Sequence, residues 1–199
     1  MNEIQKNSLD IITDIIETGL DTLSTNEFVK NFPVIGNIIK VGLTVKSIND
    51  RIFLAKLSSF LYNLEEIEKK EKKSIIKTIQ LDDKERSKIG ETLILIIEKL
   101  NSFEKPKLVS YCFASYIKKE ISFQDFNRLT NAIEIGNIHD LNEFIRDSKN
   151  KLNLDRLLNT GLVEISKTAF GQTQTGGTLV ELFINKSELG EKFLKTVKF

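Results

Sequence analysis

The sequence contains a single cysteine, a single histidine and two prolines among its 199 residues, and each scarcity excludes a class of protein. One cysteine excludes an intramolecular disulfide framework, so the reducing cytoplasm is the expected location. The lone histidine has no second histidine or cysteine near it in sequence, so the spacing typical of a zinc site is missing. Two prolines and no low-complexity tract leave no sign of a long flexible linker.

The chain also lacks an excess of charge and a long apolar run. Its 29 basic and 28 acidic residues give a net charge of +1, so DNA or an acidic membrane would have to be held by a local patch. No window reaches the roughly 18 uninterrupted apolar residues of a membrane-spanning helix. The start, MNEIQKNSLDIITDII, mixes charges with its apolar residues and has no small-residue cleavage site, so we expect no signal peptide.

The sequence does contain strong helical periodicity, most clearly between residues 82 and 119. Apolar residues recur there at spacings of three and four and predict two consecutive helices, with a break at NSFEK. Asp82, with Glu85 three residues later, predicts a capping box at the start of the first helix. Pro106 suits the first turn of the second helix, where its missing N–H costs nothing. These two helices must be packed against other elements.

Other helices are predicted on both sides of this pair. On the N-terminal side, we expect an amphipathic helix over residues 3–23, a short one ending at Pro33, and a long one from Ile35 to Glu66, kinked near Gly42. A solvated charge run over 65–73 and a short helix over 74–80 follow. On the C-terminal side, Ser122 and Asn137 are capping residues that predict two further short helices, with Gly136 ending the first.

The pattern changes after Lys151. Residues 152–159 predict a short helix that Gly161 ends, and two apolar segments, GLVEISKT and TLVELFINK, predict strands joined by the glycine-rich tip 169–177. A final helix is expected from Ser187. The sequence therefore predicts a mainly α fold, with a helical bundle over 1–120 and a second module over 121–199 that contains a two-stranded β-hairpin.

The end of the chain resembles winged-helix domains. The resemblance lies in the leucine-rich helix LLN, the strand that begins with Gly161 and Leu162, the glycine-rich wing, the second strand, and the Ser-x-Leu-Gly start of the last helix at Ser187. It covers roughly the last quarter of the chain. A winged helix binds DNA or contacts a protein partner, so the resemblance implies a fold more strongly than a function.

The central helices are similar to those of a group of small uncharacterised bacterial and prophage-encoded helical proteins. The similar residues are ERSKIGETLILIIEKLNSFEKPKLVSYCFASYIKKEISFQDFNRL, following PVIGNIIK. The resemblance implies a bacterial or phage origin and a role in phage and host conflict. It supplies no catalytic residue.

Several residues that could in principle act in catalysis or metal binding are better explained by structural roles. Cys112 falls on the apolar face of its predicted helix, and His139 is expected at the surface or near a helix cap. Asp82, Asp83 and Glu85 are explained by a helix cap as well as by a metal ion. The tip GQTQTGG lacks the lysine and spacing of a phosphate-binding loop. We therefore expect a non-enzymatic protein with no metal, no cofactor and no small-molecule substrate.

The second module offers a candidate surface for DNA or a protein partner. Docking to DNA would place the helix over 152–159 in the major groove, with the wing near phosphates. That helix carries one arginine and one aspartate, and the tip has no basic residue, so we favour a protein contact or a purely structural role over DNA binding. The basic residues that would make the contact are Lys149, Lys151, Arg156, Lys167 and Lys186.

An alternative function places the chain at a membrane. Glycines, β-branched residues and flanking lysines over 32–48 suit a segment that inserts after a conformational change, as in a pore-forming effector. The same pattern is explained by a core helix within the bundle. The apolar residues of this segment are Val34, Ile35, Ile38, Ile39, Val41, Leu43 and Val45. The wide apolar faces of the N-terminal helices also leave a homodimer open.

Overall fold

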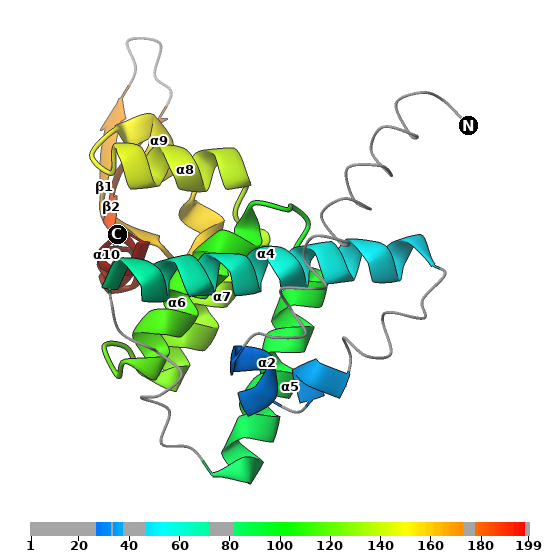
Figure 1. The fold of residues 1–199 in the computed structure, drawn as a ribbon. Helices are drawn as coiled ribbons and strands as arrows, with labels where there is room; N and C mark the ends of the chain where they lie inside the picture. Colours follow the sequence, from blue (N-terminus) through cyan, green and yellow to red (C-terminus); the bar gives the residue numbers. More distant parts are fainter. Residues whose placement is uncertain (1–26, 33, 38–46, 72–81, 173–177, 198–199) are drawn as a thin grey trace. The chain divides into compact units, whose positions relative to one another are not determined.

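The computed structural model describes residues 27–32, 34–37, 47–71, 82–172 and 178–197 (Figure 1). The chain divides into two compact units, Met1–Glu120 and Ile121–Phe199, called here the first and the second unit. The described part of the first unit is helical, and that of the second consists of helices and a two-stranded antiparallel hairpin followed by a closing helix. The prediction of a mainly α fold with a C-terminal hairpin is therefore confirmed.

The described helices of the first unit are α2 (Glu27–Asn31), α4 (Ile48–Glu71), α5 (Asp83–Lys99) and α6 (Lys105–Ile117). The predicted capping box begins α5, because the Asp82 carboxylate accepts from the Glu85 N–H at 2.8 Å and the Glu85 carboxylate accepts from the Asp82 N–H at 3.1 Å. Pro106 lies in the first turn of α6. The local capping signals thus fix where this central pair begins.

The core of the first unit forms around α6, which is buried along nearly its whole length and packs against α4. Phe113 of α6 makes edge contacts with Phe60 of α4, at 5.8 Å between ring centroids, and with Phe32, at 6.2 Å. All three rings are fully buried. Because such rings bury large apolar areas, this cluster is a main source of stability in the unit.

The prediction of one helix from Ile35 to Glu66 is wrong in its continuity and its end. Residues 34–37 are helical, but Ser47 is outside the helix and caps α4, accepting from the Asp50 N–H at 3.2 Å. The helix then continues through the predicted charge run to Glu71, where Lys69 pairs with Glu65 and Glu66. The expected helices over 3–23 and 74–80 and the kink at Gly42 lie outside the described residues.

The second unit contains α7 (Phe123–Ile135), α8 (Ile138–Arg146), α9 (Lys151–Asp155), the 3₁₀ turn η2 (Leu158–Thr160), β1 (Val163–Gln172), β2 (Thr178–Lys186) and α10 (Glu188–Val197). The predicted caps are present. Ser122 and Asp125 form a capping box on α7, and the Asn137 side chain accepts from the His139 N–H at 2.8 Å at the start of α8. Gly136 ends α7 as expected.

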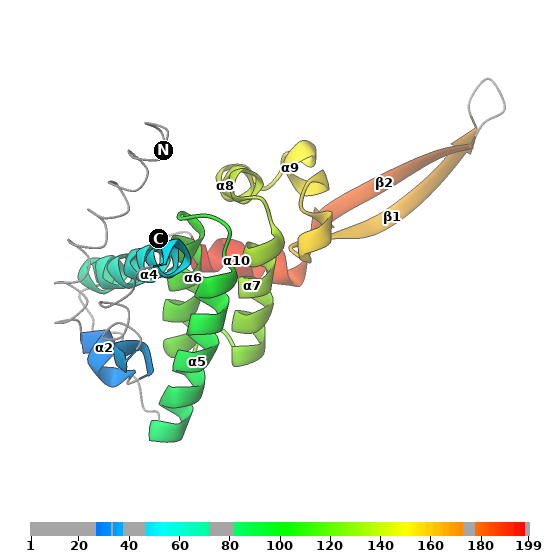
Figure 2. The same ribbon diagram turned by 90° about the vertical axis from the view of Figure 1, so that its right-hand side faces the viewer.

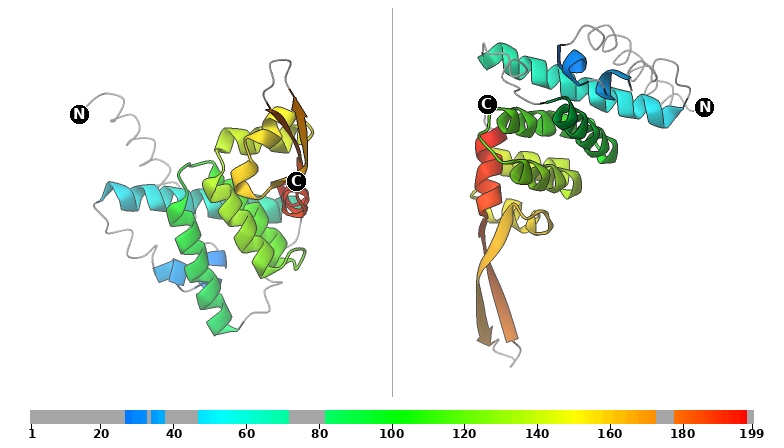
Figure 3. Two further views of the ribbon diagram at one scale, coloured as in Figure 1. Left: turned by 180° about the vertical axis from the view of Figure 1, so that it is seen from behind. Right: turned by 90° about the horizontal axis from the view of Figure 1, so that it is seen from below.

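The helices of the second unit share one core, from which the hairpin projects (Figures 2 and 3). Phe144 of α8 stacks on Phe193 of α10 at 6.3 Å between ring centroids, and both rings are fully buried. Lys192 of α10 donates to both carboxylate oxygens of Asp125 on α7, at 3.1 and 3.2 Å. Among the described elements, β2 contacts α9 and α10, and these helices lie at the base of the hairpin (Figure 2).

Candidate functional site

The base of the hairpin is fixed by a tight junction between Gly161 and α10. Gly161 has a φ of 76°, a left-handed conformation that favours glycine and ends η2 as predicted. The Ser187 hydroxyl donates to the Gly161 carbonyl at 2.6 Å and accepts from the Gly190 N–H at 3.1 Å. A Cβ on Gly190 would lie 2.0 Å from the Leu162 carbonyl oxygen, so only glycine fits there. The Ser-x-Leu-Gly segment therefore anchors the closing helix to the first strand.

Most of the hairpin's large apolar side chains are exposed. Directly paired residues of an antiparallel ladder lie on the same face, and the register pairs Phe170 with Val180, Thr168 with Leu182 and Ile165 with Ile184. An irregularity between Ile165 and Lys167 keeps Ile165 on this face. We call the following exposed residues the apolar hairpin face: Phe170 (75% exposed), Val180 (52%), Ile165 (50%) and Leu182 (37%).

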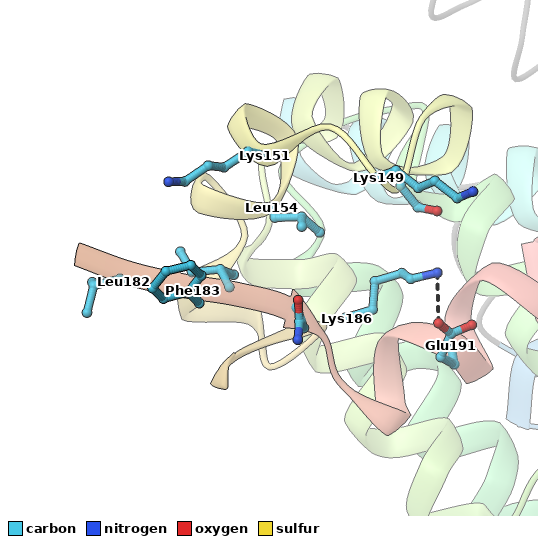
Figure 4. Close-up of a pocket in the computed structure, with 10 residues that line it drawn as sticks. Lys149, Lys151, Leu154, Leu182, Phe183, Lys186 and Glu191 are labelled. Carbon is cyan, nitrogen blue, oxygen red and sulfur yellow. Dashed lines mark ion pairs between the residues drawn. The ribbon is translucent and has the colours of Figure 1, made fainter. Parts of the chain in front are cut away.

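A groove of about 580 Å³ runs along β2 on the side away from β1 (Figure 4). Its lining contains both apolar residues and lysines. The β2 edge groove is lined by Ser148, Lys149, Lys151, Leu154, Leu182, Phe183, Ile184, Asn185, Lys186 and Glu191. It therefore combines the open side of a strand, an apolar surface and three lysines.

Three of the five predicted contact residues meet in this groove. Lys149 and Lys151 are exposed, and neither forms an ion pair with another residue of the described part of the chain. Lys186 lines the groove but pairs with Glu191 at 2.8 Å, as Figure 4 shows. The groove thus brings together lysines that are far apart in the sequence, and two of them keep their charge available.

The other two predicted contact residues lie outside the groove. Arg156 pairs with Asp140 of α8 at 3.2 Å. Lys167 lies on β1 with its ammonium 5.8 Å from the centre of the Phe183 ring, close enough for a cation–π contact. The five residues therefore do not form one continuous basic stripe.

The turn that carries Lys149 and Lys151 is held by local hydrogen bonds. The Asp147 carboxylate accepts from the Lys149 N–H at 3.2 Å, and the Asn150 side chain accepts from the Leu152 N–H at 3.1 Å and begins α9. The buried Asn153 side chain donates to the carbonyls of Glu143 and Asp147, at 3.3 and 3.0 Å. These bonds give the two lysines a defined position beside β2.

The helix expected over 152–159 is too short for the role considered for it. It is a five-residue α-helix, Lys151–Asp155, followed by the separate 3₁₀ turn at Leu158–Thr160. The polar interruptions in LNLDRLLN and the tight turn before Gly161 leave about one helical turn. A recognition helix that reaches along the major groove would need more length, so this expectation is corrected.

In the first unit, the residues considered as a nucleophile or as metal ligands are poorly placed for those roles. Cys112 is fully buried, and burial raises the pKa of its thiol to about 12, so it is a packing residue rather than a nucleophile. Asp82 and Glu85 are engaged in the cap of α5. In the second unit His139 is exposed. The described ranges hold no cluster of three or more potential metal ligands.

The predicted membrane segment is described only at its start. Ile35 is fully buried and Val34 is half-buried, and a Cβ on Gly90 of α5 would lie 3.7 Å from Val34 and 3.9 Å from Ile35. Residues 34 and 35 therefore belong to the core of the first unit in this structure. The remaining predicted residues lie outside the described ones, namely Ile38, Ile39, Val41, Leu43 and Val45. None of the described helices has the length and apolarity to cross a membrane.

A second, smaller hollow of about 400 Å³ lies between α4 and α5, beside Lys56 and Glu98. Lys56 donates to the Glu98 carbonyl at 3.2 Å, and burial lowers the pKa of Lys56 although the Glu98 carboxylate acts against this. The hollow was not predicted. Its residues come from α4 and α5 and lie far apart in sequence, so no local pattern could have indicated it.

Comparisons with family models, with curated proteins and with solved structures find no match to this chain.

Proposed function

We propose that the second unit is a winged-helix-like interaction module whose hairpin contacts a protein partner, in a non-enzymatic protein of bacterial or phage origin. The order of elements supports the module: α7, α8 and the short α9 precede the hairpin, and α10 closes it. The origin, and a role in phage and host conflict, rest on the resemblance of the central helices alone.

The observation that carries the proposal is the apolar hairpin face. A two-stranded hairpin has little stability of its own in water, and this one exposes Phe170, Val180, Ile165 and Leu182 on one face. Exposed apolar side chains gathered on one element are typical of protein interaction sites. A protein surface would bury them, whereas a DNA backbone would not.

The charge distribution also favours a protein partner over DNA. The helix considered for the major groove is about one turn long, and Arg156 and Lys186 are already paired with Asp140 and Glu191. Lys149, Lys151 and Lys167 would give a modest electrostatic contribution, since each neutralised phosphate releases about one counterion. The membrane alternative has no such support, because the described part of its segment is core.

A photo-crosslinking amino acid in place of Phe170, in cells that naturally make the protein, tests this proposal. We expect a discrete protein adduct from position 170, and none of that mass from the same group at Tyr62, an exposed aromatic residue of the first unit that is 59% exposed. An adduct of twice the chain's mass would identify the partner as a second copy.

Duplex DNA is the competing outcome. If the purified chain retards duplex DNA in a salt-dependent way, and Lys151→Glu with Arg156→Glu abolishes that retardation, the module is a DNA reader. That result, together with crosslinked products that are identical from positions 170 and 62, would refute a protein partner at the hairpin.

A further inference from the structure

The open edge of β2 has its own hydrogen-bonding capacity. The Ser187 N–H donates to the Leu162 carbonyl at 3.0 Å, and the Phe183 carbonyl accepts from the Ser166 hydroxyl at 3.0 Å, so odd-numbered residues of β2 direct their backbone groups toward β1. Because these directions alternate along an antiparallel strand, the N–H and C=O groups of Leu182 and Ile184 face the other side. Both residues line the β2 edge groove.

This edge is not paired by another strand among the described residues, where the sheet consists of β1 and β2 alone. An open edge that presents N–H and C=O groups is a template for one more strand. Natural proteins use this arrangement to bind extended peptides, with the backbone supplying affinity and flanking side chains supplying specificity. The groove's volume, about 580 Å³, lies within the range of about 300–1,000 Å³ typical of ligand sites.

The charges around the groove determine what kind of strand fits. Lys149 and Lys151 lie on its α9 side and form no ion pair with the other described residues, and Lys186 contributes a third positive charge that Glu191 offsets. Leu154, Leu182 and Phe183 supply apolar contacts between them. A segment that alternates acidic and apolar residues complements both features, because alternate side chains of a strand point to opposite faces.

From these features we infer that the β2 edge groove binds an extended acidic segment of a partner protein, which adds to β2 as a third strand. Its backbone bonds to Leu182 and Ile184, and its carboxylates meet Lys149 and Lys151. This inference rests on the proposed function, since it names the chemistry of the partner and a second contact beside the apolar hairpin face.

The test uses the full chain and two terminally blocked peptides, (Glu-Val)₄ and (Lys-Val)₄, at concentrations where neither associates with itself. We expect (Glu-Val)₄ to bind and to slow hydrogen exchange at the amides of Leu182 and Ile184. Its affinity should fall as the salt concentration is raised. The (Lys-Val)₄ peptide should bind at least tenfold more weakly. Equal binding of the two peptides, or no slowing at β2, would overturn the inference.

Two variants locate the site. Lys149→Glu with Lys151→Glu should weaken binding of the (Glu-Val)₄ peptide about tenfold. Lys195 is an exposed lysine of α10 outside the groove, and Lys195→Glu should leave binding unchanged. Ile184→Pro should abolish binding because it removes an outward N–H while sparing the bonds to β1. Should Ile184→Pro fail to fold, the lysine pair decides the matter. Binding that survives the lysine reversal would overturn the inference.

The experiments separate this inference from the proposed function. If the adduct from position 170 forms equally well in the lysine-reversed chain and (Glu-Val)₄ does not bind the wild type, the hairpin contacts a partner without a third strand. If duplex DNA displaces (Glu-Val)₄ from the groove, and the affinity for DNA depends on Lys149 and Lys151, the groove binds the phosphates of DNA and the inference fails.

Discussion

Helix α6 and the hairpin are both rich in apolar side chains, yet they bury them to opposite extents. In α6, Phe113, Val109 and Cys112 are fully buried among α4 and its neighbours. In the hairpin, Phe170 is 75% exposed and Val180 is 52% exposed. An apolar segment therefore does not by itself indicate core. This difference indicates that α6 stabilises its unit, whereas the apolar hairpin face is available to contact another molecule.

The largest effect is expected in the core of the first unit. Phe113→Ala removes a ring that contacts Phe32 and Phe60, and it should lower the free energy of unfolding by about 3–5 kcal/mol. The chain has no tryptophan, and its three tyrosines are Tyr62, Tyr111 and Tyr116, so tyrosine fluorescence in denaturant reports on this unit. A loss below 1 kcal/mol would mean that the cluster is not core.

A smaller loss is expected at the base of the hairpin. Gly190→Ala places a Cβ against the Leu162 carbonyl oxygen and should destabilise the second unit by about 1–3 kcal/mol. Hydrogen exchange over residues 121–199, followed by mass spectrometry, measures this. Gly90→Ala is the matched control, because the nearest atom to its Cβ would be 3.7 Å away and alanine favours a helix. Equal effects of the two changes would contradict the tight junction.

The contact between α7 and α10 should weaken in acid. Partial burial acts to raise the pKa of Asp125, but hydrogen bonds from Lys192 and Ser122 outweigh it and hold that pKa below its usual value. A carboxyl with a lowered folded pKa adds stability above its unfolded pKa, and that stability is lost as the pH falls through the folded pKa. We therefore expect the second unit to weaken below about pH 4.

The variant Asp125→Asn isolates this contact. It should remove part of the acid-dependent loss in the second unit, because the amide keeps a cap acceptor but cannot titrate. Denaturant unfolding at pH 7 and pH 3, followed by hydrogen exchange over 121–199, measures the change. Asp155→Asn, at an exposed aspartate outside the contact, serves as control. An unchanged pH dependence in Asp125→Asn would show that the pair with Lys192 contributes nothing.

The smallest effect on stability is expected where the proposal assigns a function. Phe170→Ser with Val180→Thr changes exposed residues, so the free energy of unfolding should stay within about 0.5 kcal/mol of the wild type. The same pair should remove the adduct from a photo-crosslinker at Ile165, on the same hairpin face. A stability loss comparable to that of Phe113→Ala would mean that these side chains are covered within the chain.

Local signals were read correctly from the sequence because they act over a few residues. The capping boxes at Asp82 and Ser122 are present, and Gly161 ends the turn before β1 with its positive φ. The same kind of signal at Ser47 and Asp50 was overlooked, because the apolar periodicity around it favoured one unbroken helix. Strand β1 extends to Gln172, beyond the predicted segment, because pairing with β2 continues there.

The candidate site was only partly predictable. Lys149, Lys151 and Lys186 were predicted as contact residues, but their meeting in one groove depends on how α9 packs beside β2. The pairing of Arg156 with Asp140 likewise depends on the approach of α9 to α8. The apolar hairpin face left a signal that was missed: TLVELFINK has apolar residues at both parities, more than one buried face requires.

The most direct test of this account compares the two regions within one molecule. In Phe170→Cys, the new thiol and Cys112 are labelled with an aromatic disulfide reagent at pH 8. The account predicts that one thiol reacts at once, whereas Cys112, buried and with its pKa raised to about 12, reacts only when denaturant is added. A slow reaction at position 170 in the purified chain would show that the hairpin face is already covered and would contradict its availability to a partner.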